Sequence, residues 1–168
     1  MKTYGEERSF LESCGVRVVE LSDESGRARV CLVPAWQGRV MTSTAAGTGG
    51  PGYGWINRSL IASGVRKSRF NPFGGEERLW LGPEGGPFSL YFAPGAEQVY
   101  ANWQVPVALD TEPFRVVGRD ARQVRFEAEM SLRNAAGTRF EIGVARRVGL
   151  LSHRQAEVSL GRVLPPEL

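Results

Sequence analysis

Histidine and lysine are scarce in this sequence, and each shortage argues against a class of chemistry. The one histidine, His153, stands in an arginine-rich segment near the C-terminus, so neither a histidine-based nucleophilic site nor a histidine-ligated metal site is expected. Lys2 and Lys67 are the only lysines among 21 basic residues, and the formal net charge is only +3. The arginines are scattered and interleaved with acidic residues. Because nucleic-acid binding requires a basic stripe, nucleic acid is not an expected partner.

Cysteine and long apolar runs are also lacking. Cys14 and Cys31 are the only cysteines and form no paired motif, which favours two free thiols in a reducing compartment but leaves a single disulfide open. No run reaches the roughly 18 apolar residues of a membrane-spanning helix, and residues 1–14 lack the apolar core of a secretory leader. We therefore expect a cytoplasmic protein without a membrane partner. The sequence indicates no metal or other cofactor.

Glycine and proline, by contrast, are plentiful. The 168 residues include 21 glycines and 10 prolines, with 42% hydrophobic and 23% charged residues. This length and composition predict one globular domain, residues 1–168. The abundance of turn-forming residues favours many short strands over long helices.

Hydrophobic periodicity predicts an all-β protein with one short helix at its start. Residues 3–13 fit a helix, because Thr3 and Glu6 have the spacing of a capping box. Apolar alternation with a period of two predicts two hairpins, formed by residues 16–21 with 28–33 and by residues 124–130 with 139–144. With further short segments between them, the pattern predicts roughly ten strands in an antiparallel β-sandwich.

The chain is organised around residues 71–86, in which two glycine-rich turns bracket a short expected strand. On an extended strand Glu76, Arg78 and Trp80 project to one side and the intervening leucines to the other. A flat aromatic ring beside a guanidinium and a carboxylate is suited to stacking on a sugar and hydrogen-bonding its hydroxyls. The alternative is a surface ion pair between Glu76 and Arg78, with Trp80 half-buried.

Three further tryptophans also lie near glycine or proline turns. Trp55 and Trp103 are candidates for ring stacking on a carbohydrate, and Asn57 shares the expected strand face of Trp55. Trp36 is expected in the core instead.

These segments carry a resemblance to a known group. Residues 71–86, with residues 103–106 (Trp-Gln-Val-Pro) and 110–114 (Asp-Thr-Glu-Pro-Phe), resemble an uncharacterised bacterial family related to the galactose mutarotase-like (aldose 1-epimerase-like) proteins. Residues 34–40 are similar to the early strand pair of that superfamily, and the resemblance spans about residues 10–165. It implies a β-supersandwich that binds carbohydrate in a groove on one sheet.

The same resemblance assigns roles to individual residues. Arg78, which follows Gly74 and Gly75, corresponds to the arginine that contacts the sugar. Mutarotases use histidines as the acid and a later glutamate as the base, and this chain has no matching histidine in its middle. The resemblance therefore implies the N-terminal part of a larger domain, with an incomplete sandwich. Glu76 and Glu84 are the candidate catalytic pair for aldose 1-epimerase-like isomerisation, although nothing in the sequence places them at a catalytic separation.

Two functions follow as hypotheses. The first is a carbohydrate-binding or carbohydrate-active mutarotase-like domain whose groove is lined by Arg78, Trp80, Trp55, Asn57 and Trp103. The alternative is a non-catalytic β-sandwich used for protein interaction or assembly, in which Trp80 and Trp103 belong to the core. The exposed edges of an unfinished sandwich also favour self-association.

Overall fold

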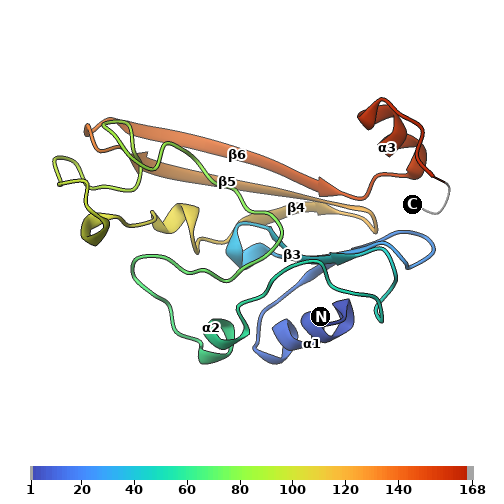
Figure 1. The fold of residues 1–168 in the computed structure, drawn as a ribbon. Helices are drawn as coiled ribbons and strands as arrows, with labels where there is room; N and C mark the ends of the chain where they lie inside the picture. The colour runs from blue at the N-terminus through green and yellow to red at the C-terminus, as the bar shows by residue number, and fades with distance from the viewer. Residues whose placement is uncertain (1, 166–168) are drawn as a thin grey trace.

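The computed structural model describes residues 2–165 and consists mainly of β-strands and irregular segments, with three short helices (Figure 1). The helices are α1 (Tyr4–Ser13), α2 (Arg58–Ser63) and α3 (His153–Leu160). The strands are β1 (Val19–Ser22), β2 (Arg29–Val33), β3 (Arg39–Thr44), β4 (Arg115–Arg119), β5 (Gln123–Arg133) and β6 (Arg139–Gly149). Short 3-10 turns occupy Pro34–Trp36, Tyr100–Asn102 and Val107–Leu109.

The strands form two antiparallel three-stranded sheets, ordered β1-β2-β3 and β4-β5-β6, which we call the N-terminal and C-terminal sheets. β5 and β6 pair in continuous register over all 11 residues of each strand. At the start of α1, the Thr3 side chain accepts a hydrogen bond from the backbone N–H of Glu6, and the Glu6 carboxylate accepts one from the backbone N–H of Thr3. The β-rich class, the first helix with its capping box and both hairpins are therefore confirmed.

Residues 64–114 are largely irregular, so the described chain has six strands where roughly ten were expected. Residues 76–81 contribute an isolated bridge, between Glu77 and Val40, and form no strand. The prolines of this segment lack the N–H that a central strand must donate, and its glycine pairs favour turns. Its backbone is held by scattered hydrogen bonds instead, such as the one from the Gln104 N–H to the Tyr91 carbonyl at 2.9 Å.

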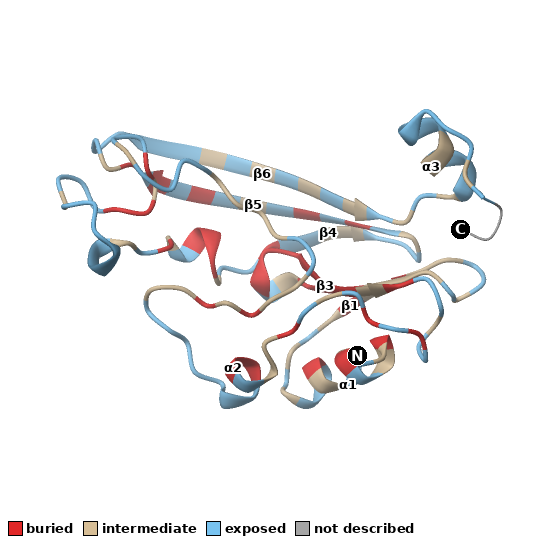
Figure 2. Cartoon of the chain, viewed as in Figure 1, coloured by how far each residue is buried: buried red, intermediate tan, exposed pale blue. Residues whose placement is uncertain are grey.

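The N-terminal sheet is covered on both faces. One face shares a hydrophobic cluster with the C-terminal sheet, to which Leu32 of β2 and Phe126 of β5 contribute. The opposite face packs with α1 and α2 in a second cluster, in which Cys31 and Trp36 are buried. Successive residues of β2 therefore point into different clusters. The expected core position of Trp36 is confirmed, and Figure 2 shows how buried residues concentrate between the elements.

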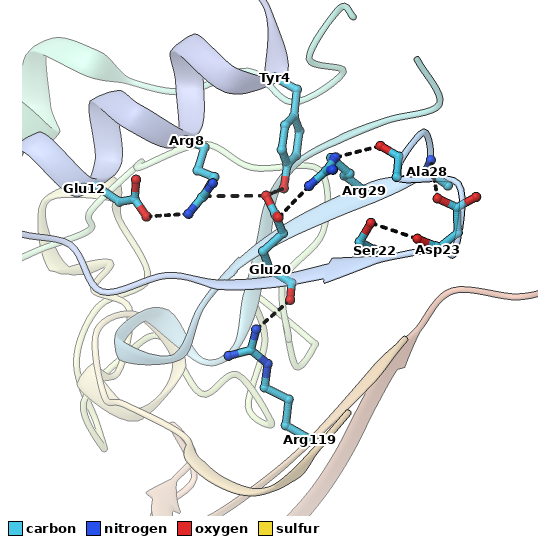
Figure 3. Close-up of polar contacts among 10 residues, drawn as sticks. Tyr4, Arg8, Glu12, Glu20, Ser22, Asp23, Ala28, Arg29 and Arg119 are labelled. Carbon is cyan, nitrogen blue, oxygen red and sulfur yellow. Dashed lines mark hydrogen bonds and ion pairs between the residues drawn. The ribbon is translucent and has the colours of Figure 1, made fainter. Parts of the chain in front are cut away.

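Glu20 on β1 connects α1 with both sheets (Figure 3). Its carboxylate accepts a hydrogen bond from the Tyr4 hydroxyl at 2.9 Å and pairs with Arg29 of β2 at 2.7 Å. Its backbone carbonyl accepts a hydrogen bond from Arg119, at the end of β4, at 2.8 Å. Burial, reinforced by the charge of Glu20, raises the pKa of the Tyr4 hydroxyl strongly, so Tyr4 remains a donor.

The two cysteines are free thiols, so the disulfide that the sequence left open is not formed. Burial raises the pKa of the Cys31 thiol to about 12, which keeps it protonated and unreactive at neutral pH. Within residues 2–165, no helix has both the length and the apolar character needed to cross a membrane.

Candidate functional site

Four aromatic rings of the irregular segment stack in a row, which we call the aromatic ladder: Trp80, Tyr91, Trp103 and Tyr100. Successive ring centroids are 5.1, 5.7 and 6.3 Å apart. Phe70 meets both tryptophans edge-on, at 6.0 and 6.1 Å. Tyr91 is buried and Tyr100 is 75% exposed, so the ladder runs from the core to the surface.

A guanidinium group lies over each end of the ladder. The Arg78 Cζ atom is 4.4 Å from the ring centroid of Trp80, and the Arg69 Cζ atom is 4.8 Å from that of Tyr100. Both are within the range of a cation–π interaction. The indole N–H of Trp80 donates a hydrogen bond to Glu84 at 2.9 Å. A guanidinium, an indole and a carboxylate therefore meet at the Trp80 end.

Arg78 is anchored in the protein beneath this end. Its Nη2 atom donates a hydrogen bond to the backbone carbonyl of Leu109 and lies 3.5 Å from the side-chain oxygen of Gln37. The same atom is 3.7 Å from Asp110 Oδ1, and the Arg78 side chain is 18% exposed. Burial lowers the pKa of Arg78, and the charge of Asp110 opposes that shift. The alternative surface pair between Glu76 and Arg78 is therefore wrong, because the carboxylate beside Arg78 is Asp110.

Asp110 connects Arg78 to the start of the central segment. Its Oδ2 atom accepts hydrogen bonds from the backbone N–H of Asn71, at 2.9 Å, and from the side-chain amide of Asn71, at 2.8 Å. The Asn71 side chain in turn accepts a hydrogen bond from the backbone N–H of Lys67 at 2.8 Å. Asn71 and Asp110 are both buried, so this network holds the start of residues 71–86 against Asp110.

A second buried guanidinium belongs to Arg39 of β3, which is 1% exposed. Arg39 donates a hydrogen bond to the Gly74 carbonyl at 3.2 Å, while its Nε and Nη2 atoms have no hydrogen-bond partner in the described chain. Burial, aided by the charge of Arg78, lowers the pKa of Arg39 to about 10. The negative charge of Asp110 opposes the lowering of the pKa of both Arg39 and Arg78, but Asp110 forms an ion pair only with Arg78 among the described residues.

Arg39→Met is expected to raise the free energy of unfolding at neutral pH by about 1–3 kcal/mol, because it removes a buried charge without a carboxylate partner. In the parent protein the pKa of Arg39 is about 10, below its usual value. Above pH 10 the unfolded chain therefore binds more protons than the folded one. The free energy of unfolding of the parent protein consequently increases as the pH rises. Urea unfolding of both proteins should show that the difference between their free energies of unfolding becomes smaller above pH 10. A variant less stable than the parent would contradict this account.

Trp55 and Asn57 do not belong to the aromatic ladder and have other contacts. Trp55 is 64% exposed, and in the described part of the chain no ring stacks on it and no guanidinium lies over it. Asn57 begins α2, where its side chain accepts a hydrogen bond from the Leu60 N–H at 3.2 Å and donates one to the Pro72 carbonyl at 3.0 Å. Trp55 and Asn57 flank Ile56, which forms an isolated antiparallel bridge with Gly74, and α2 begins directly after Asn57, so the expected strand is reduced to this single bridge.

The two candidate catalytic glutamates, Glu76 and Glu84, have different hydrogen-bond partners. Glu76 accepts a hydrogen bond from the Ser43 hydroxyl of β3 at 2.7 Å, whereas Glu84 is bound to the Trp80 indole. These hydrogen bonds therefore do not bring the two carboxylates together. The structure brings Arg78, Trp80, Glu84 and Trp103 together, and it places Glu76 with β3 instead.

Phe70, Tyr91, Tyr100 and the anchoring role of Asp110 were not predicted from the sequence. One signal was available: Tyr100 and Trp103 are three residues apart, and a 3-10 turn places such residues on one side. The pairing of Asp110 with Asn71 spans 39 positions and has no local signature.

A separate hollow of about 650 Å³ lies against the C-terminal sheet. Its lining includes Glu112, Arg115, Glu127 and Glu129, and its one aromatic residue, Phe114, is buried. Without an exposed ring, this hollow lacks a stacking surface, so we consider the ladder the stronger candidate site. Among residues 2–165, no group of three or more histidine, cysteine, aspartate or glutamate side chains is arranged to hold a metal ion.

The fold and the site define a β-rich protein with a partly exposed aromatic ladder between two arginines. The chain belongs to a family of unknown function, DUF6786, whose sequence model matches residues 2–168. It matches no curated protein and no solved structure.

Proposed function

We propose that the protein binds carbohydrate at the aromatic ladder. The observation that carries this proposal is the combination of near-parallel rings with polar groups at both ends. The planes of Tyr91 and Trp103 differ by 6°, and those of Trp103 and Tyr100 by 13°. Stacked rings cover one another's faces, so the surface open to the C–H face of a sugar is that of Tyr100, which is 75% exposed at the end of the ladder, while the arginines and Glu84 serve its hydroxyls.

The exposed end of the ladder is the more accessible stacking surface. Trp80 is covered by Tyr91 and by the guanidinium of Arg78, whereas Tyr100 remains 75% exposed although the guanidinium of Arg69 lies over its ring. We therefore propose that the sugar stacks on Tyr100, because both faces of Trp103 are covered, by Tyr91 and by Tyr100. Arg69 would donate to a hydroxyl near Tyr100, because its side chain already lies at that ring.

We propose binding rather than turnover as the function of this site. Epimerisation requires an acid and a base on the same sugar, and Glu76 and Glu84 are held by different elements. The galactose mutarotase-like supersandwich remains part of the proposal, supported by the hydrophobic cluster that the two sheets share. A reducing, cytoplasmic compartment is supported by the free thiols of Cys14 and Cys31.

Titration with neutral hexoses, uronic acids and their oligosaccharides should change the tryptophan fluorescence of the folded protein. Tyr100→Ala should weaken that response about tenfold or more, because it removes the most exposed ring of the ladder. Trp55→Ala is the matched control, since Trp55 is similarly exposed but lies outside the ladder. It should leave the affinity unchanged.

Two outcomes would count against the proposal: no response to any sugar, or a response that Trp55→Ala abolishes and Tyr100→Ala does not. Arg78→Ala is a poorer test than either, because Arg78 also binds Leu109 and Asp110 and its loss disturbs the fold.

A further inference from the structure

β6 is a long edge strand that has neither a proline nor a bulge, although it carries charged side chains. It is the last strand of the C-terminal sheet, and its 11 residues pair with β5 on one side only (Figure 1). Natural edge strands are usually short or carry a proline or bulge that prevents pairing with another chain. β6 contains no proline, and its register with β5 shows no bulge. Its far edge therefore offers backbone N–H and C=O groups to a partner.

The outer face of the C-terminal sheet sets one arginine of β6 directly against an arginine of β5. Arg147 stands directly opposite Arg125 of β5, and both are exposed. Like charges in directly opposed positions destabilise a sheet. Six residues earlier on the same face is Glu141, whose side chain is 66% exposed and pairs with Arg139 of the same strand at 2.5 Å. A carboxylate placed beside Arg147 would relieve the repulsion.

We propose that two copies of the chain associate through β6, antiparallel to one another about a two-fold axis at Val144. In this register Arg139 lies opposite Gly149 of the partner, and Glu141 lies opposite Arg147 of the partner. Because a two-fold interface repeats each contact, the Glu141–Arg147 pair forms twice. The product is one six-stranded sheet with β6 of both copies at its centre.

Two independent features select this register. Val144 is the middle residue of β6, so centring the axis there pairs all 11 residues end to end. The same register places opposite charges together. Moving the axis to Gly143 would instead set Arg139 against Arg147 of the partner, a like-charge pair on the outer face.

Exposed apolar side chains are distributed as this pairing requires. Phe140, at the start of β6, is 41% exposed, and Leu151, Val158 and Leu160, beyond its end, are 59%, 75% and 59% exposed. Antiparallel association brings the start of β6 in one copy beside the segment that follows β6 in the other. Each copy therefore covers an apolar surface of its partner.

The oligomeric state of the full chain tests this proposal, measured by light scattering across a concentration series. The parent protein should be a dimer. Glu141→Arg should weaken dimerisation on the order of tenfold or more, because both charge pairs become repulsive. Arg147→Glu should do the same for the opposite reason. Both positions are exposed, so neither variant should lose its fold.

The mixture of the two single variants is the sharpest arm of the experiment. An equal mixture of Glu141→Arg and Arg147→Glu chains restores opposite charges at both positions, so it should dimerise although each variant alone does not. The double variant E141R/R147E should also regain the dimer. A monomeric parent would overturn the proposal. So would single variants that dimerise as well as the parent, or a mixture that stays monomeric.

A cysteine cross-link tests the register itself. Val144→Cys places two thiols directly opposite one another at the axis, about 4.5–5.5 Å apart between Cα atoms, which permits a disulfide. Ala145→Cys moves the thiols two residues out of alignment and should not cross-link. Equal cross-linking of both variants would contradict a two-fold axis at Val144.

Discussion

Asp110→Ala is expected to lower the free energy of unfolding by about 3–5 kcal/mol, measured by urea denaturation. The change removes the carboxylate that accepts two hydrogen bonds from Asn71 and lies beside Arg78. It leaves the buried backbone N–H of Asn71 without its partner and the guanidinium of Arg78 without its counter-charge. Removing one member of a buried ion pair is costly for this reason.

Two controls separate charge from position in this experiment. Asp110→Asn retains an oxygen for Asn71 but removes the negative charge, so its loss of stability should be smaller than that of Asp110→Ala. Glu112→Ala removes an exposed carboxylate two residues away and should change stability by less than about 0.5 kcal/mol. An Asp110→Ala protein as stable as the Glu112→Ala protein would contradict the role assigned to Asp110.

Gly74→Ala is expected to destabilise the protein by about 2–5 kcal/mol, because it combines backbone strain with a steric clash. Gly74 has a φ of +90°, in the left-handed region that favours glycine. A Cβ atom at this position would lie 2.1 Å from the backbone carbonyl oxygen of Trp55. The two segments that meet there, residues 55–57 and 71–75, would have to separate.

Gly137→Ala is the matched control for strain without a clash. Gly137 has a φ of +87°, and a Cβ atom built there meets nothing within 4 Å. Its replacement should cost about 1–2 kcal/mol, the price of the backbone conformation alone. Equal losses for the two variants, measured by thermal or urea unfolding, would argue that the close approach of Gly74 to Trp55 has no energetic importance.

Local sequence patterns predicted the elements that depend on local physics. The capping box of Thr3 and Glu6 indicated α1, and strict alternation of apolar and charged residues indicated β5 and β6. The core position of Trp36 also followed from the sequence. Each of these features is decided within about a dozen residues, where periodicity and capping dominate.

The irregular segment could not be predicted in the same way. Residues 76–81 alternate as a strand would, but Leu79, Trp80 and Leu81 all pack partly against the cluster shared by the sheets. Long-range contacts therefore override the period of two at this point. The nearby prolines and glycines, which bracket the segment, were the indication that no regular ladder of hydrogen bonds could form.

The candidate site was predicted in part. Arg78, Trp80, Glu84 and Trp103 lie together, but Trp55 and Asn57, which the sequence analysis placed with them, flank the bridge between Ile56 and Gly74 and lie outside the aromatic ladder. The buried partner of Arg78 is Asp110, which is 32 positions away, and no spacing rule connects them. Pairings of this kind depend on the route of the irregular segment, which only the folded chain defines.

Arginine contacts with backbone carbonyls occur at several junctions of the molecule: Arg119 with Glu20, Arg39 with Gly74, Arg78 with Leu109, and Arg146 with Gly38. A guanidinium can bind a carbonyl through one N–H group while its plane lies over a ring or its other groups meet a carboxylate. An ammonium has three donors but no planar, forked arrangement, so it does not reproduce this combination of contacts in the same geometry. Replacing these arginines by lysine, usually counted as a conservative change, would therefore preserve the net charge but disrupt these contacts. The four arginine positions therefore depend on the shape of the guanidinium as well as on its charge.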